Sequence, residues 1–141
     1  MGDVIIKAAK DRDLYLIWST VVDGPVAVYP SVEDLREHLW KEYRRQHPHC
    51  VPQPGYGPNA RITRADVYGS SAAPDDNGAY GWDEESWGID GYGIPDGRWD
   101  LPRANLVAYV EAVLQNDMDA AAKQLRPYIE EDGCQVVGPS T

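Results

Sequence analysis

The stretch that decides the fold is DLYLIWSTVVDGPVAVYP, residues 13–30. Alternate residues of a strand point to opposite sides, so Leu14, Leu16 and Trp18 would face one way and Tyr15 and Ile17 the other. Because both sides are apolar, we expect a central strand that is covered on each face. The stretch predicts a β-hairpin whose turn is residues 23–25, with a positive φ at the glycine of that turn.

A helix is predicted directly after the hairpin, over about residues 31–46. Ser31 fits the N-cap, and Glu33 and Asp34 suit the positive end of the helix dipole. Arg44 and Arg45 lie at the negative end, before Pro48 stops the helix. The residues that share one apolar stripe are Val32, Leu35, Leu39, Trp40 and Tyr43.

The middle of the chain is irregular. Residues 47–60 hold four prolines and two glycines, which predicts a loop. RITRADVYG, residues 61–69, is predicted as a strand, and residues 70–78 as another loop. Residues 79–100 are interrupted by glycines, so we expect only short strands there, near 80–82, 86–89 and 97–99.

The pattern becomes helical again at Asp100, which is expected to cap a helix that has Pro102 in its first turn. Its apolar stripe is Leu106, Val110, Val113 and Leu114. Asn116-Asp117 should break this helix and cap a second one over about 118–128, followed by a loose tail or an edge strand. We therefore expect one α+β domain over residues 1–141. An antiparallel sheet built on the N-terminal hairpin should pack with about three helices and an irregular middle rich in Gly, Trp and Tyr.

The net charge of −10 is concentrated in one segment. Residues 75–100 carry eight acids and one base, whereas residues 1–50 carry eight acids and seven bases. Such a field repels phosphates and attracts cationic surfaces, so we expect no direct binding to nucleic acid. No apolar run is long enough to cross a membrane, and the charged N-terminus does not resemble a signal peptide, so we expect a cytoplasmic protein. Cys50 and Cys134 then favour reduced thiols, although a disulfide between them stays open.

The acidic segment AYGWDEESWGIDGYGIPDGRWD, residues 79–100, has the composition of a binding loop. Tyr and Trp give a large contact area at low entropic cost, and glycines let a loop conform to a partner. We expect these rings to face outward and to bind a protein with a basic surface. The anchors would be Trp82, Trp87, Tyr92 and Trp99, with Asp83, Glu84, Glu85 and Asp90 as the charged rim. In the alternative interpretation the tryptophans fill the core, because the chain contains no phenylalanine.

Two other functions remain open. Two of the clustered carboxylates could act as the acid and base of a small hydrolase on a sugar-like substrate. The carboxylates could also mimic DNA phosphates, although their spacing is irregular. His47, His49 and Cys50 are ligand types for zinc, but their spacing matches no known zinc motif, and we expect no metal, no cofactor and no catalytic residue.

Three phrases resemble small uncharacterised proteins encoded by phages of actinobacteria. They are DLYLIWSTVVDGPVAVYPSVEDLREHL (13–39), GSSAAPDDNG (69–78) and WDLPRANLVAYVEAVLQNDMDAA (99–121). The resemblance covers about half of the chain and contains no functional motif, so it assigns no role to any residue. It implies an accessory protein inside the host cell, and an acidic aromatic surface would suit an inhibitor or recruiter of a host protein. We therefore expect a non-enzymatic interaction module, of undetermined oligomeric state, that contacts its partner through residues 80–100.

Overall fold

The computed structural model describes residues 3–90 and 98–128, which form two three-stranded antiparallel sheets and four helices. The first sheet has the order β1-β2-β3, with β1 at Asp3–Ala9, β2 at Arg12–Ser19 and β3 at Gly24–Tyr29. The second sheet has the order β4-β5-β6, with β4 at Ser86–Asp90, β5 at Arg98–Pro102 and β6 at Arg126–Pro127. The helices are α1 (Val32–Gln46), α2 (Pro58–Tyr68), α3 (Leu106–Leu114) and α4 (Met118–Ala122). This is the α+β class that the sequence predicts.

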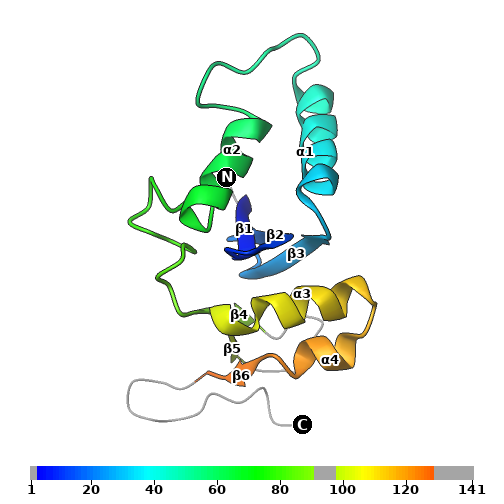
Figure 1. Ribbon diagram of the computed structural model, residues 1–141, viewed down its shortest axis with the longest axis vertical. Helices are drawn as coiled ribbons and strands as arrows, with labels where there is room; N and C mark the ends of the chain where they lie inside the picture. Colours follow the sequence, from blue (N-terminus) through cyan, green and yellow to red (C-terminus); the bar gives the residue numbers. More distant parts are fainter. Residues whose placement is uncertain (1–2, 91–97, 129–141) are drawn as a thin grey trace.

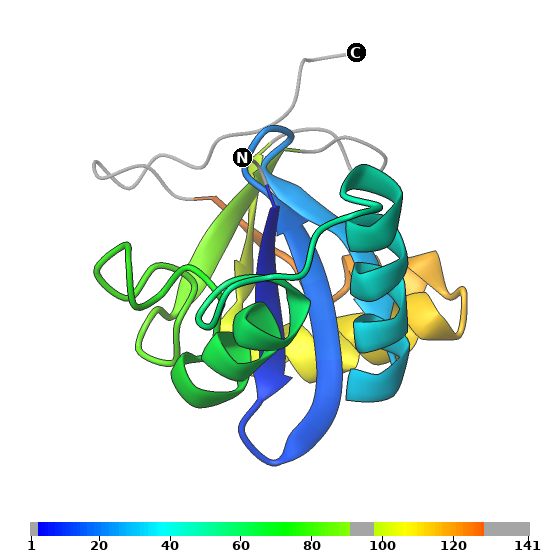
Figure 2. The same ribbon diagram turned by 90° about the horizontal axis from the view of Figure 1, so that it is seen from above.

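The first sheet lies in the middle of the molecule, between two layers (Figure 1). Helices α1 and α2 cover one face, as Figure 2 shows from above. On this face Ile5, Tyr15 and Ile17 belong to one buried cluster with Leu35 and Ile62 of the helices. The opposite face, which includes Leu16 and Trp18, packs against α3 and the second sheet. The prediction that the first hairpin strand is central and covered on both sides is confirmed.

The hairpin of β2 and β3 is confirmed, but its turn differs from the prediction. Asp23 takes the left-handed conformation, with φ 52°, whereas Gly24 already pairs with Ser19 as the first residue of β3. The Ser19 hydroxyl accepts hydrogen bonds from the backbone N–H groups of Val21 and Val22, at 3.2 and 3.3 Å. This interaction sets a longer turn, over residues 20–23, and aspartate is among the residues that tolerate a left-handed backbone.

Strand β1 was not predicted from the sequence, although it supplies one edge of the first sheet. It pairs antiparallel with β2 from Asp3 opposite Ser19 to Ala9 opposite Arg12. Its outer edge is covered by residues 69–71, because Lys7 N–H donates to the Gly69 carbonyl and Ser71 N–H to the Ile5 carbonyl, at 3.0 and 2.8 Å. The loop that follows α2 therefore blocks the pairing groups that an edge strand would expose.

Helix α1 matches its prediction, and the Ser31 hydroxyl accepts from the Asp34 N–H at its N-cap. The prediction of a strand over 61–69 is wrong, because these residues belong to α2. Pro58 stands in its first turn and Gly69 ends it with φ 93°, which are standard start and stop signals. Ile62 and Ala65 share the buried side of this helix, and this three-residue spacing fits a helix.

The first helix of the C-terminal third begins later than the sequence predicts. Asp100 and Pro102 belong to β5, a 3-10 turn covers Arg103–Asn105, and α3 starts only at Leu106. Leu114, predicted to be in the core, is 40% exposed. The Asp117 side chain caps α4 as predicted, but α4 ends at Ala122 instead of near residue 128, and Pro127 lies in β6.

Two of the three short strands predicted between residues 79 and 100 are present. Residues 80–82 form no strand, whereas the predicted strands near 86–89 and 97–99 correspond to β4 and β5. The predicted tail lies outside the described residues, as does Cys134, whereas Cys50 is an exposed free cysteine. In the part of the chain that the structure describes, none of the helices has the length and apolarity that a membrane crossing requires.

Candidate functional site

Arg103 organises the acidic aromatic segment from inside the molecule. Its guanidinium donates to four backbone carbonyls, those of Gly81 and Lys7 at 3.0 Å, Tyr80 at 2.8 Å and Gly69 at 3.3 Å. These carbonyls belong to β1, the end of α2 and the loop before β4. Burial lowers the pKa of Arg103 to about 10, with Glu84 acting in the opposite direction. The arginine therefore joins three segments that lie far apart in the sequence, and sequence reasoning missed it.

Two predicted anchors use their rings to hold this arginine. The Arg103 guanidinium carbon lies 4.7 Å from the Trp82 ring centre and 5.2 Å from that of Trp87. Trp82 is partly buried and also faces Lys10 at 5.5 Å, while its indole N–H donates to the Val67 carbonyl. Trp87 is only 6% exposed, so the prediction that it faces outward is wrong. The cations that contact these two rings are therefore residues of this chain, Arg103 and Lys10.

Only part of the predicted charged rim is exposed to solvent. Glu84 points inward, because one carboxylate oxygen accepts from the Tyr80 N–H at 2.8 Å and from the Trp87 indole N–H. Asp83 and Glu85 are exposed, as predicted for a rim. Glu84 is therefore a structural acceptor.

The other three predicted contact residues are split between the core and undescribed parts of the chain. Trp99 is partly buried and packs against the main core. Asp90 ends β4, with its side chain outside the described part, and Tyr92 lies wholly outside it. The outward-facing row of rings that the sequence predicts is thus not found among Trp82, Trp87 and Trp99.

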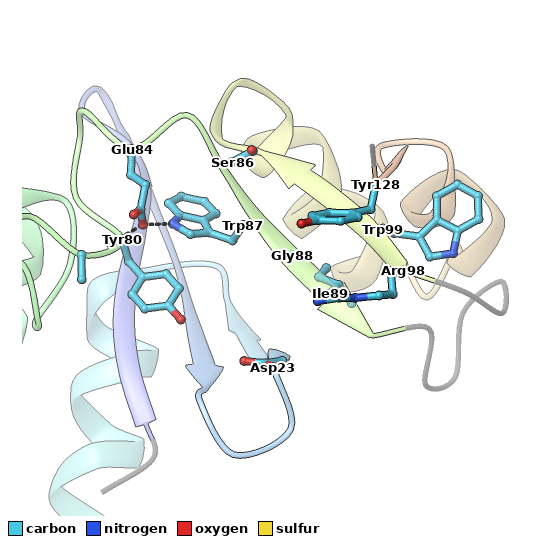
Figure 3. Close-up of a pocket in the computed structure, with 11 residues that line it drawn as sticks. Asp23, Tyr80, Glu84, Ser86, Trp87, Gly88, Ile89, Arg98, Trp99 and Tyr128 are labelled. Atoms are coloured by element: carbon cyan, nitrogen blue, oxygen red, sulfur yellow. Dashed lines mark hydrogen bonds between the residues drawn. The ribbon is translucent and has the colours of Figure 1, made fainter. Parts of the chain in front are cut away.

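A pocket of about 430 Å³ opens beside β4 (Figure 3), within the range of about 300–1,000 Å³ that is usual for ligand pockets. We call it the β4 pocket. Rings, two carboxylates and a guanidinium meet in it. Its principal lining residues are Asp23, Tyr80, Glu84, Ser86, Trp87, Gly88, Arg98, Trp99 and Tyr128. Tyr80 and Glu84 lie on one side of β4, and Arg98, Trp99 and Tyr128 on the other.

Tyr80 is the most constrained residue of the β4 pocket. Its φ of 59° is in the left-handed region, which is uncommon for an aromatic residue and costs about 1–3 kcal/mol. The backbone is fixed there by the bonds of its N–H to Glu84 and of its carbonyl to Arg103. Burial is the main cause that raises the pKa of Tyr80, and the negative charges of Asp23, Glu84 and Asp76 add to it. Three carboxylates therefore act on this phenol.

The opposite end of the β4 pocket carries a positive charge. The Arg98 guanidinium lies 4.8 Å from the ring centre of Tyr128, and the Tyr128 N–H donates to the Arg98 carbonyl at 3.1 Å. Neighbouring Asp100 has a pKa raised by burial, which Arg98 partly offsets. The Arg98 end of the pocket is thus positive, whereas Asp23 and Glu84 line the Tyr80 end, where the buried Arg103 offsets part of the Glu84 charge.

The turn that contributes Asp23 also carries exposed apolar side chains. Val21 is 82% exposed, and Val22 and Val26 are each 54% exposed. These three valines lie within six residues, in the β2–β3 turn and the start of β3, and Val21 also lines a second pocket together with His38 and Leu39 of α1. We call residues 21–26 and the Tyr80 side of the β4 pocket the hairpin face. Sequence reasoning placed these valines in the hairpin but assigned them no contact role.

The described residues contain no group of three His, Cys, Asp or Glu side chains positioned to hold a metal ion. The hairpin face combines exposed valines, a fixed ring and nearby carboxylates. No family model, curated protein or solved structure matches this chain.

Proposed function

We propose that this chain is a non-enzymatic interaction module that binds a basic surface of another protein through its hairpin face. The partner would be a host protein in the cytoplasm, as the resemblance to small phage proteins implies. This proposal keeps the acidic interaction module expected from the sequence but moves its contact surface. The rings of Trp82 and Trp87 are occupied by Arg103, so they do not provide the anchors.

The observation that carries the proposal is the position of Asp23. It lies in the same turn as the exposed Val21 and Val22, and its carboxylate lines the β4 pocket beside Tyr80. Exposed apolar side chains in the same turn as a carboxylate that lines a concave site resemble the arrangement of protein interfaces, in which apolar anchors are surrounded by polar groups.

The charge of the whole chain supports a basic partner. The net charge is −10, and Asp83 and Glu85 are exposed in the loop that leads into β4. Such a field speeds encounter with a cationic surface and makes the association rate sensitive to salt. The apolar contacts would then hold the complex after encounter.

The test compares two valines of equal exposure. Val22 is 54% exposed in the hairpin face, and Val67 is 55% exposed on α2, so neither lysine substitution should disturb the fold. The wild type and both variants, immobilised at equal density, would be incubated with host lysate, and the captured proteins quantified by mass spectrometry. We expect a protein that wild type and Val67→Lys retain equally and that Val22→Lys loses by about tenfold, since an inserted cation repels a basic partner.

Three outcomes contradict this proposal. Equal capture by both variants would show that the hairpin face is not the contact surface. Capture that DNA competes away would favour the DNA mimic, and turnover of an oligosaccharide that Glu84→Gln abolishes would favour the hydrolase.

A further inference from the structure

We propose that the β4 pocket receives an arginine side chain of the partner, with its guanidinium between the Asp23 carboxylate and the Tyr80 ring. This inference rests on the proposed function, because it names the group that the same site binds. It goes further by assigning the chemistry of recognition to one place, the Tyr80 side of the pocket.

The Tyr80 side of the pocket is suited to a cation. Asp23 and Glu84 both line it, and together with Asp76 they act on the Tyr80 phenol. These groups come from the β2–β3 turn and from two parts of the loop before β4, so the fold concentrates negative charge that is scattered in the sequence. A guanidinium entering here would be attracted by these carboxylates and could donate to Asp23.

Tyr80 provides a ring that is already in position. Its backbone is fixed by Glu84 and Arg103, and its ring packs 5.7 Å from the ring centres of Trp18 and Trp87. A contact surface that needs no ordering loses less entropy on binding. A planar guanidinium stacks on an aromatic ring better than an ammonium does, which favours arginine over lysine.

The chain already uses this type of contact beside the pocket. Arg103 stacks on Trp87 from the interior, and Arg98 stacks on Tyr128 at the far end. The positive charge of Arg98 disfavours a cation at its own end of the pocket. A bound guanidinium is therefore directed to Asp23 and Tyr80.

The first experiment titrates isotope-labelled protein with the peptide acetyl-Gly-Arg-Gly-amide and with its citrulline analogue, followed by NMR. Citrulline has nearly the same shape as arginine but is neutral, so the pair isolates the charge. We expect saturable shifts of the Trp87 indole N–H and the Tyr80 amide with the arginine peptide, and at least about tenfold weaker binding of the citrulline peptide. Equal affinity for both peptides, or shifts confined to other parts of the chain, would overturn the proposal.

The second experiment removes the carboxylate. Asp23→Asn suits the left-handed backbone, because asparagine tolerates φ 52°. The control is Asp11→Asn, in the exposed turn between β1 and β2 at the other end of the same sheet. We expect Asp23→Asn to weaken the arginine peptide about fivefold or more and Asp11→Asn to leave it unchanged. Equal affinities of Asp23→Asn and wild type would refute the role of Asp23.

The two proposals can fail separately. If Val22→Lys loses the partner but the arginine peptide does not bind, the hairpin face stands and the arginine pocket is wrong. If the peptide binds as expected but Val22→Lys and Val67→Lys retain the same proteins, the pocket stands and the docking role is wrong.

Discussion

The two sheets of this molecule have the same number of strands but differ in how many of their faces are buried. The first sheet is buried on both faces, and the last six residues of β2, Leu14–Ser19, are all buried. The second sheet buries Trp87, Ile89 and Leu101 on one face, whereas Ser86 and Gly88 are exposed on the other. Burial of apolar area is therefore sufficient to explain the first sheet, and it explains only half of the second.

The second sheet and the loop before it depend on a few specific contacts, some of them polar and one between aromatic rings. Arg103 and Glu84 fix the chain at Tyr80, and Trp18 of the first sheet packs against Trp87 of the second at 5.9 Å. The β4 pocket opens in this region, and it is lined by Trp87 and Ile89 of the buried face of β4 as well as by Ser86 and Gly88 of the exposed face. We propose that the first sheet is the scaffold whose hairpin carries the contact residues, and that the second sheet lines the other side of the β4 pocket.

The largest expected effect comes from Arg103→Met. Methionine keeps part of the packing against Trp82 and Trp87 but leaves the Tyr80 carbonyl without its donor and the Gly81 carbonyl with only the Glu84 N–H. Partly buried acceptors without partners are costly, so we expect the free energy of unfolding to fall by about 3 kcal/mol in urea denaturation.

The matched control for Arg103 is Arg12→Met. Arg12 forms an exposed salt bridge with Glu111 at 2.9 Å, and such pairs contribute about 0–1 kcal/mol. If Arg103→Met cost no more than Arg12→Met, the second sheet would not depend on its arginine, and the contrast between the sheets would be lost.

This contrast also explains what the sequence could predict. Leu16, Trp18 and Leu35 lie in short periodic patterns, and local signals (period, turn residues and helix caps) identified the hairpin and α1. The error over α2 was avoidable, because Pro58 and Gly69 mark the start and end of a helix, and Ile62 and Ala65 have helical spacing. Strand β1 was missed because VII, residues 4–6, is a short apolar run that becomes a strand through its pairing with β2.

The candidate site depends on contacts between distant segments, which no local pattern records. Trp82 and Trp87 look like binding anchors in the sequence, because the cation that occupies them, Arg103, lies beyond the segment that contains them. Asp23 and Tyr80 are far apart in the sequence and meet only through the packing of the hairpin against the loop before β4. The acidic composition predicted the charge of the surface, but its location required the fold.

A second, smaller effect should appear in alkali through Tyr15 of the first sheet. Burial, with help from Asp66 and Asp13, raises the pKa of Tyr15 from 10.0 to about 12. A pKa that is higher in the folded state means that the neutral phenol is favoured there. The contribution of this neutral phenol to the free energy of unfolding is complete below about pH 10 and is lost as the pH rises from about 10 towards 12. We expect this to cost about 2 kcal/mol of unfolding free energy, measured by urea denaturation at successive pH values.

Tyr15→Phe tests the assignment, because phenylalanine cannot ionise. Its stability should fall less steeply than that of wild type over the same pH range. Tyr56 is 72% exposed, so Tyr56→Phe should follow the wild-type curve. If the Tyr15→Phe and wild-type curves ran parallel above pH 10, the phenol would not be held neutral by the buried face of the first sheet.

The smallest expected effect is a gain in stability at Gly88→Ala, on the open face of the second sheet. A Cβ added at Gly88 meets no atom within 4 Å, and its φ lies outside the left-handed region, so alanine fits without strain. Alanine also lowers the entropy of the unfolded chain, and we expect a gain of about 0.5 kcal/mol in the free energy of unfolding. The contrasting variant is Gly81→Ala. Its added Cβ would lie 2.9 Å from the Tyr68 carbonyl oxygen, a backbone atom that cannot easily move aside, so this variant should lose stability. A loss at Gly88 comparable to that at Gly81 would mean that the second sheet is covered on both faces, like the first, and the contrast between the two sheets would be lost.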